Sequence, residues 1–253
     1  MWLTHSIRRS LSRPFRLPLS THWTRFATMF CLAAVRQARV ALGMTDDLTR
    51  LAAKYKSDKG VTIFPFHGYT LHYDRLFRRL RHQPLTILEI GLARRDDRDI
   101  LSAACPSLSI WLDYFPQATV CGFDIDDFSG VSLPRTQIFR GDQGSPEDLL
   151  RVVQEHPVLD IVIDDGSHAS YHQQVSLRTL FPHLATGGMY IIEDLMWQPD
   201  DLESTLPAVP KTLDLLTDSA ALGQLIWPGQ DVQILASPTQ VGNRGLAVIT
   251  KTS

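Results

Sequence analysis

The sequence predicts a doubly wound α/β domain built on a mostly parallel sheet. Five short aliphatic runs alternate with stretches of helical periodicity, and they read TILEIG, TVCGFDID, TQIFRGD, LDIVIDDG and MYIIEDL. Runs that are apolar on both faces are typical of parallel strands covered by helices on both sides. The predicted fold class is therefore Rossmann-like.

Two further strands are predicted near the end of the chain. The run DVQILAS begins at Asp231, and GLAVITK follows after PTQVGNRG. A connection rich in Pro, Gly and Asn favours a reversal of chain direction. We therefore expect a seven-stranded sheet with an antiparallel C-terminal edge strand.

Two helices are expected before the first strand. DDLTRLAAKY has apolar residues at helical spacing behind an acidic cap, and SDKG ends it with a glycine. HGYTLHYDRLFRRLR predicts a second amphipathic helix. Residues 46–82 are expected to form a helical lid on a domain that spans residues 46–253.

Residues 1–45 differ in composition from the rest. They carry seven arginines and no Asp or Glu, with a short apolar stretch from Phe26 to Val35. We expect a helical or disordered N-terminal extension. The sequence leaves open whether it is a targeting, membrane-surface or oligomerisation segment, or translated sequence upstream of a start at Met44.

Composition narrows the functional classes. The chain is 44 % hydrophobic and 21 % charged with a formal charge of −2, and no apolar run reaches the roughly 18 residues of a transmembrane helix. Because the extension is basic, the remainder is more acidic than the whole, which argues against nucleic-acid binding. The three cysteines show no metal or disulfide spacing, so a cytoplasmic location is expected.

Each of the first five predicted strands ends in acidic or polar residues. These are Glu89 and Gly91, then Asp124 and Asp126, then Gly141, Asp142 and Gln143, then Asp164 and Asp165, and finally Glu193 and Asp194. A single Asp at such a position often caps the following helix. Five strands in succession place like charges on one rim, where ligands of such sheets bind, and this indicates a site.

The first three strand ends predict a nucleoside pocket. Gly91 would let the backbone approach a ligand, Asp124 would accept hydrogen bonds from ribose hydroxyls, and Asp142 with Gln143 could read an adenine edge. The sequence has neither a complete GxGxxG nor a Walker motif. A nucleoside without phosphate is therefore favoured over a pyrophosphate cofactor.

The fourth and fifth strand ends predict a metal site. If these strands are neighbours, Asp165, Glu193 and Asp194 can converge on a hard cation such as Mg²⁺. His168, three residues after Asp165, could then take a proton from a hydroxyl whose pKa the metal has lowered. The alternative is a hydrogen-bonded structural histidine.

Together these motifs resemble class I S-adenosylmethionine-dependent methyltransferases, and within them the Mg²⁺-dependent mycinamicin-type sugar O-methyltransferases of macrolide biosynthesis. The resemblance covers Leu48 to Leu195. It is carried by LAAKYKSDKG, HGYTLHYDRLF, ILEIGL, SLSIWLDYFP, FDID, GDQ, DIVIDDGSH and YIIEDL.

The resemblance implies a role for each candidate residue. The cofactor S-adenosylmethionine would be bound by Lys59, His67, Tyr69, Glu89, Gly91, Asp124, Asp142, Gln143 and Asp164. The metal Mg²⁺ would be bound by Asp165, Glu193 and Asp194, and His168 would be the general base. The implied reaction is methylation of a hydroxyl on a sugar, glycoside or other polyol.

Some features leave alternatives open. The loop LARRDDRDILSAACPSLSI lacks the glycines that the family usually carries there. A nicotinamide-dependent oxidoreductase and a non-catalytic, methyltransferase-like binding protein therefore remain alternatives. The expected partner is a small glycosidic acceptor and not a nucleic acid; peripheral membrane contact through residues 1–45 and a homo-oligomer are left open.

Overall fold

The computed structural model of the chain describes residues 47–63, 67–92, 105–238 and 245–252. The predictions for the basic extension 1–45, and for the glycine-poor loop between residues 93 and 104, lie outside the described residues.

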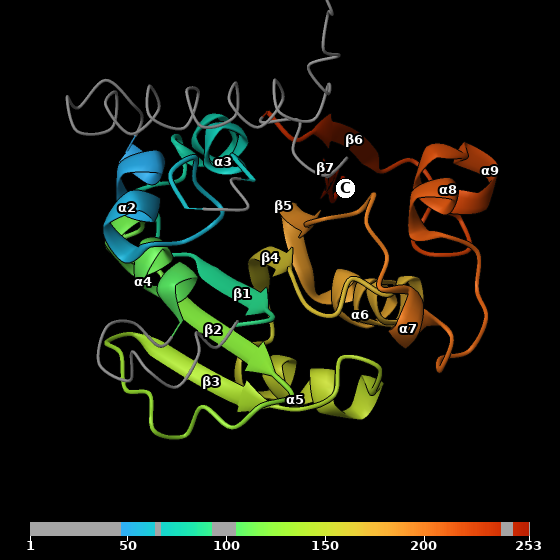
Figure 1. The fold of residues 1–253 in the computed structure, drawn as a ribbon, viewed down its shortest axis with the longest axis horizontal. Coiled ribbons are helices and arrows are strands. Elements are labelled where there is room, and N and C mark those ends of the chain that lie inside the picture. The colour runs from blue at the N-terminus through green and yellow to red at the C-terminus, as the bar shows by residue number, and fades with distance from the viewer. Residues whose placement is uncertain (1–46, 64–66, 93–104, 239–244, 253) are drawn as a thin grey trace, which may run out of the picture.

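A seven-stranded sheet forms the centre of the molecule (Figure 1). Its order is β3-β2-β1-β4-β5-β7-β6. The strands are β1 (Thr86–Ile90), β2 (Thr119–Asp124), β3 (Thr136–Arg140), β4 (Leu159–Asp164), β5 (Leu184–Ile192), β6 (Asp231–Ala236) and β7 (Gly245–Thr250). The first five strands pair in parallel, and β7 pairs antiparallel with both β5 and β6.

The predicted fold class is confirmed, with one refinement at the C-terminal end. The antiparallel strand β7 lies between β5 and β6, so β6 occupies the edge. This position follows from burial: GLAVIT of β7 is apolar and buried along almost its whole length, whereas β6 alternates exposed and partly buried residues.

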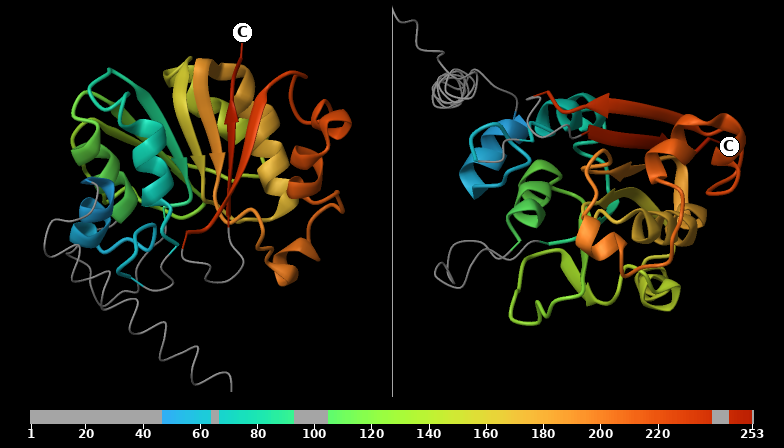
Figure 2. Two further views of the ribbon diagram at one scale, coloured as in Figure 1. Left: turned by 90° about the horizontal axis from the view of Figure 1, so that it is seen from above. Right: turned by 45° about the vertical axis from the view of Figure 1, so that its right-hand side comes forward.

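Helices cover both faces of the sheet (Figure 2). One core contains residues of α2 (Asp47–Tyr55), α3 (Thr70–Phe77) and α4 (Pro106–Tyr114). The other contains residues of α5 (Pro146–Glu155), α6 (Ser170–Leu180), α8 (Thr212–Thr217) and α9 (Ser219–Leu222). Successive residues of β1 point to opposite cores, Ile87 to the first and Leu88 to the second. The short helices η2 (Phe181–His183) and α7 (Asp200–Glu203) complete the described structure.

The order of the strands reverses between β1 and β4, and the loops after these two strands cross closely. Gly91, which follows β1, has φ of +87°, and a Cβ at this position would lie 2.1 Å from the carbonyl oxygen of Asp165 after β4. Only glycine tolerates both conditions. Ligands of doubly wound sheets bind beside such a reversal, which makes this rim the expected site.

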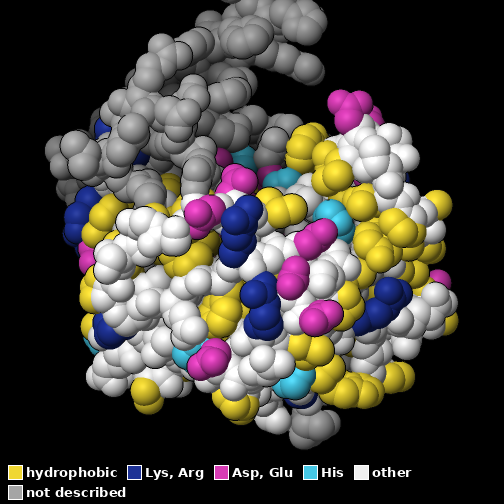
Figure 3. All heavy atoms as spheres, turned by 90° about the horizontal axis from the view of Figure 1, so that it is seen from below, with side chains coloured by type: hydrophobic (Ala, Val, Ile, Leu, Met, Phe, Trp, Pro, Cys, Tyr) yellow, Lys and Arg dark blue, Asp and Glu magenta, His cyan; other side chains and the backbone are white. Residues whose placement is uncertain are grey.

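The surface is mixed in character. On the described part of the face in Figure 3, acidic, basic and histidine side chains are interspersed with apolar ones. Within the ranges that the structure describes, no helix combines the length and the apolar character needed to cross a membrane.

Candidate functional site

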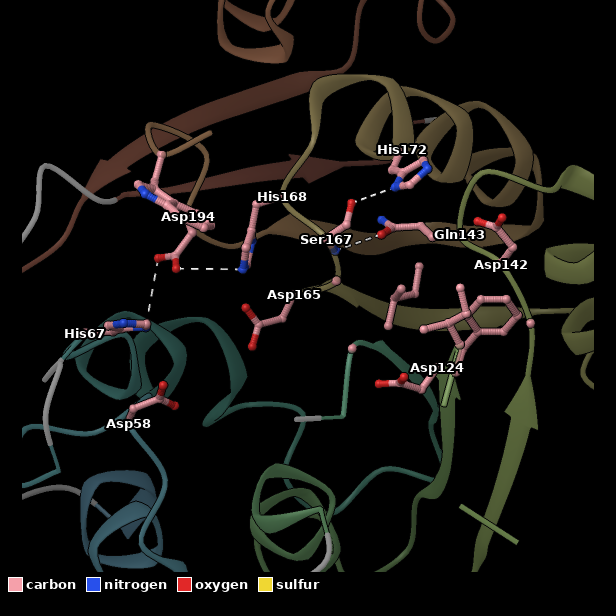
Figure 4. Close-up of a pocket in the computed structure, with 17 residues that line it drawn as sticks. Asp58, His67, Asp124, Asp142, Gln143, Asp165, Ser167, His168, His172 and Asp194 are labelled. Atoms are coloured by element: carbon pink, nitrogen blue, oxygen red, sulfur yellow. Dashed lines mark hydrogen bonds and ion pairs between the residues drawn. The ribbon is translucent and has the colours of Figure 1, made fainter. Parts of the chain in front are cut away.

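A cavity of about 610 Å³ opens at the carboxyl ends of the strands (Figure 4). Its lining comes from the ends of β1 to β5 and from segments outside the sheet. The lining residues are Asp58, His67, Ile90, Gly91, Phe123, Asp124, Ile125, Gly141, Asp142, Gln143, Asp165, Gly166, Ser167, His168, His172, Asp194 and Trp197. Residues far apart in the sequence thus share one space.

The structure places the predicted site residues in two groups. Those that line the cavity are His67, Gly91, Asp124, Asp142, Gln143, Asp165, His168 and Asp194. Those that are buried behind its wall are Lys59, Tyr69, Glu89, Asp164 and Glu193. The second group supports the first through hydrogen bonds and ion pairs.

Asp124, at the end of β2, is held in a fixed orientation by the backbone. Its Oδ2 accepts a hydrogen bond from the amide of Leu92 at 2.7 Å, and its Oδ1 accepts one from the amide of Asp126 at 2.9 Å. A carboxylate has about four acceptor positions, so each oxygen retains capacity for a hydroxyl in the cavity. This geometry suits a vicinal diol such as a ribose.

Gln143 lines the cavity, but its amide is used by the protein. Its Nε2 donates to Asp164 Oδ1 at 2.7 Å, and its Oε1 accepts from the Ser167 amide at 3.0 Å. Gly166 allows this approach, because a Cβ there would lie 2.3 Å from Gln143 Oε1. Gln143 therefore ties the end of β3 to the loop after β4.

Asp164 points away from the cavity. It is 1 % exposed and accepts hydrogen bonds from Ser176 Oγ at 2.5 Å and Tyr190 Oη at 3.1 Å, in addition to the Gln143 amide. Burial raises the pKa of Asp164, and these donors oppose that effect. Its place in the structure is that of an internal anchor for β4.

Three potential metal ligands converge at the other end of the cavity. One ligand atom each from Asp165, His168 and Asp194 lies within 4.8 Å of the others. His168 Nε2 is 4.0 Å from Asp194 Oδ2, and His67 Nδ1 is 3.9 Å from Asp194 Oδ1. The expectation that β4 and β5 are neighbours, on which this site depended, is confirmed by their pairing.

The backbone at this cluster is strained at two of its members. His168 has φ of +61° and Asp194 has φ of +53°, in the left-handed region that residues other than glycine rarely adopt. Such conformations are costly and concentrate at functional sites. Here they place both side chains at the same end of the cavity (Figure 4).

Lys59 lies behind the cluster as a buried counter-ion. Its Nζ is 2.5 Å from Asp165 Oδ2, 2.7 Å from Glu193 Oε1 and 3.3 Å from Glu89 Oε1, and the residue is 2 % exposed. Burial alone would lower the pKa of Lys59, but the three carboxylates outweigh it and raise that pKa well above its ordinary value. Lys59 is held as a cation.

Glu193 is buried, and only one of its two carboxylate oxygens is hydrogen-bonded among the described residues. Its Oε1 accepts from Tyr73 Oη at 2.5 Å as well as from Lys59, while its Oε2 has no hydrogen-bond partner among the described residues. Burial raises the pKa of Glu193 well above its ordinary value, and the Asp165 carboxylate adds to this. A buried carboxylate oxygen without a partner is costly, and a cation would relieve that cost.

The segment before α3 contacts the cluster. Tyr69 Oη donates to Asp194 Oδ1 at 2.5 Å, and His67 packs against the Tyr69 ring with centroids 5.2 Å apart. Burial and the Asp194 carboxylate raise the pKa of Tyr69 far above its ordinary value, so it stays a donor. Tyr69 and His67, two residues of the predicted lid, thus lie against Asp194, a predicted metal ligand.

Sequence reasoning did not single out four of the lining residues whose side chains can form hydrogen bonds. They are Asp58, Ser167, His172 and Trp197. Asp58 lies in the motif SDKG and Ser167 in DGSH, so both could have been predicted from their positions next to other candidate residues. The Trp197 ring contacts the His168 ring at 5.3 Å between centroids. His172, in the first turn of α6, had no signal beyond its helical position.

No family model matches the chain. Among curated proteins, it is 43 % identical over 157 residues to the 8-demethyl-8-(2-methoxy-alpha-L-rhamnosyl)-tetracenomycin-C 3'-O-methyltransferase of Streptomyces olivaceus. It is 41 % identical over 152 residues to the mycinamicin VI 2''-O-methyltransferase of Micromonospora griseorubida. The matches cover 62 % and 60 % of this chain. The resemblance to sugar O-methyltransferases is confirmed.

Solved structures of these sugar O-methyltransferases agree. The MycE methyltransferase in complex with Mg and SAH has a TM-score of 0.65 at 29 % identity, over 96 % of this chain and 66 % of MycE. Its complex with Mg, SAH and mycinamycin VI gives a TM-score of 0.63 at 28 % identity, over 96 % of this chain and 68 % of that one. The chain spans 39 % and 36 % of the length of the two curated relatives.

Proposed function

We propose that the protein is an S-adenosylmethionine-dependent, Mg²⁺-assisted O-methyltransferase that acts on a hydroxyl of a sugar or glycoside. The observation that carries this proposal is the convergence of Asp165, His168 and Asp194 at one end of a cavity whose other wall presents Asp124. A cavity with a carboxylate that suits a ribose, beside a cluster of hard ligands, fits methyl transfer to an oxygen.

The residues present fit the cofactor. Asp124 offers acceptor capacity at both carboxylate oxygens for the ribose, and Ile90, Phe123 and Ile125 supply an apolar flank. Gly91 keeps the adjoining loop close to the loop after β4. Glu89, which was expected to bind the cofactor, is fully buried and accepts from Trp111 Nε1 at 3.1 Å.

The residues present also fit a divalent cation. Carboxylate oxygens are the ligands that Mg²⁺ prefers, and Asp165 and Asp194 supply them. Around Lys59, one positive charge faces the carboxylates of Glu89, Asp165 and Glu193, which leaves an excess of negative charge. The unpartnered Glu193 Oε2 makes this residue the third candidate ligand.

His168 is positioned to accept the proton of the acceptor hydroxyl. When bound, Mg²⁺ would lower the pKa of a nearby hydroxyl, and S-adenosylmethionine would supply the methyl group. The His168 imidazole faces the same carboxylates, with Nε2 4.0 Å from Asp194 Oδ2. Tyr69 donates to Asp194 and His67 lies beside the same carboxylate, so Asp194 is held next to the His168 imidazole that would take the proton.

The acceptor is proposed to be a glycoside. This class is supported by the relatives named for rhamnosyl and olivosyl compounds. On the side of His168, the exposed Trp197 offers an aromatic face against which a sugar ring could pack.

Calorimetric titration tests the proposal first. The full chain, supplied with Mg²⁺, is titrated with S-adenosylmethionine and in parallel with NAD. Saturable binding of S-adenosylmethionine alone supports the methyltransferase. Binding of NAD alone would support the oxidoreductase alternative, and a folded sample that binds neither would support the non-catalytic one.

Methyl transfer is then assayed with mycinamicin VI and with a rhamnosyl tetracenomycin, each with Mg²⁺ and with excess chelator. Transfer of labelled methyl that the chelator abolishes supports both the reaction and the role of the metal. Transfer that is unchanged by the chelator would contradict the metal assignment.

A further inference from the structure

A hydrogen-bonded pair of side chains, Ser167 and His172, lies beside the predicted nucleoside pocket (Figure 4). Ser167 Oγ and His172 Nδ1 are 2.7 Å apart, and both residues line the cavity. Neither belongs to the carboxylate cluster at the other end. The pair therefore lies in the part of the cavity away from the predicted metal site.

The hydrogen bonds around Ser167 suit an imidazole of His172 that carries its hydrogen on Nε2. Ser167 Oγ accepts from the amide of Ala169 at 3.3 Å, so its own hydrogen is available to donate to His172 Nδ1. A neutral imidazole that accepts at Nδ1 carries its hydrogen on Nε2. Burial lowers the pKa of His172, although Asp142 and other acids oppose it, and this favours the neutral ring.

The Nε2 atom of His172 and the carboxylate of Asp142 both lie beside Gly144. A Cβ built on Gly144 would be 2.9 Å from His172 Nε2 and 3.3 Å from Asp142 Oδ1, so the two atoms flank the same point. Gly144 leaves room for this approach. Its amide also donates to Asp142 Oδ1 at 2.7 Å and orients that carboxylate.

A donor beside an acceptor matches one edge of adenine. The 6-amino group of adenine donates, and its ring nitrogens N1 and N7 accept. Gln143 cannot supply the donor of this pair, because the two hydrogens of its Nε2 are donated to Asp164 Oδ1 and Ser176 Oγ. His172 and Asp142 are the lining side chains on this wall that remain.

We propose that His172 is a specificity-determining residue that donates from Nε2 to a ring nitrogen of a 6-aminopurine, while Asp142 accepts from the 6-amino group. The inference rests on the proposed function and extends it to the choice of base. A 6-oxopurine would present a carbonyl oxygen to the Asp142 carboxylate, and the site would reject it. Ser167 positions the imidazole for this role.

The test is calorimetric titration of the Mg²⁺-supplied full chain with S-adenosylhomocysteine and with its 6-oxo analogue, S-inosylhomocysteine. The wild-type protein is expected to bind the adenine compound at least about 10-fold more tightly. In His172→Ala, loss of one hydrogen bond is expected to lower the affinity for S-adenosylhomocysteine about 3- to 10-fold. The ratio of the affinities for the two compounds should fall with it.

Two further variants separate recognition from folding. His172→Gln places an amide donor near the position of Nε2. It should recover most of the preference for S-adenosylhomocysteine over S-inosylhomocysteine. His156→Ala is the matched control, because His156 is a partly exposed histidine outside the cavity lining whose Nε2 lies 3.0 Å from the side-chain oxygen of Gln137. It should leave both affinities unchanged.

The outcomes are distinct. An unchanged ratio in His172→Ala, with S-adenosylhomocysteine still bound by the wild type, would overturn the role of His172 and leave the methyltransferase proposal standing. A folded wild type that binds neither compound would overturn both. If His172→Ala and His172→Gln lose affinity equally for both compounds, His172 is structural and the inference is wrong.

Discussion

Lys59 Nζ lies 2.5 Å from Asp165 Oδ2, although the two residues are 106 positions apart in the chain. This contact joins the segment between α2 and α3 to the loop after β4. It places a buried cation next to a predicted metal ligand. Charge thereby couples the predicted lid to the predicted metal site.

Replacing Lys59 tests this coupling. Lys59→Met removes a cation that pairs with three carboxylates, and breaking a buried ion pair from one side costs about 3–5 kcal/mol of unfolding free energy. Mg²⁺ should restore part of this loss, because it supplies positive charge to the same carboxylates. Urea unfolding with and without Mg²⁺ measures both effects.

Lys54→Met is the control for that experiment. Lys54 pairs with Asp113 at 2.7 Å on the surface, where solvent screens the interaction. The free energy of unfolding of Lys54→Met should differ little from that of the wild type, and it should not depend on Mg²⁺. Equal stability of Lys59→Met and the wild type would contradict the proposed role of Lys59.

Gly91→Ala tests the close crossing at the strand reversal. The added Cβ would lie 2.1 Å from the Asp165 carbonyl oxygen at a φ of +87°, so we expect a loss of roughly 2–4 kcal/mol and weakened cofactor binding. Gly130→Ala is the matched control, since a Cβ there meets nothing within 4 Å. Chemical denaturation and calorimetry check both variants; similar stability of the two would refute the packing argument.

His168→Ala tests the general base. Cofactor affinity should stay close to that of the wild type, because His168 is assigned to the acceptor hydroxyl. Turnover should fall by about 10²- to 10⁴-fold, the usual contribution of general base catalysis. The check is kcat for methyl transfer together with calorimetric Kd for S-adenosylmethionine. Full activity would remove His168 from the mechanism.

Asp165→Asn tests the metal ligand. The amide keeps the shape but loses the charge, so Mg²⁺ affinity should fall by about 10-fold or more while the cavity next to Asp124 still binds the cofactor. Titration of the metal against each variant measures this. Asp160→Asn is a control at the other end of β4, where Asp160 accepts from the Thr86 amide. Unchanged Mg²⁺ affinity in Asp165→Asn would mean that the cation binds elsewhere.

The sequence by itself determined the sheet and the rim that carries the site. Apolar runs at the spacing of parallel strands predicted β1 to β5, and the acids that follow them reach one edge because parallel strands end together. Asp124, Asp165, His168 and Asp194 all line the cavity, as that argument requires. The periodicity of a strand is local, so it can be read from the chain.

Only the tertiary structure decided which side chains face the cavity and which support it. Lys59 was expected at the cofactor but contacts Asp165 and Glu193, because the fold brings the two segments together across more than a hundred residues. The side-chain amide of Gln143 is hydrogen-bonded to Asp164 and to the Ser167 amide, whereas His172, which was not predicted, lines the pocket. Hydrogen-bond pairing between distant segments depends on packing, and no spacing along the chain encodes it.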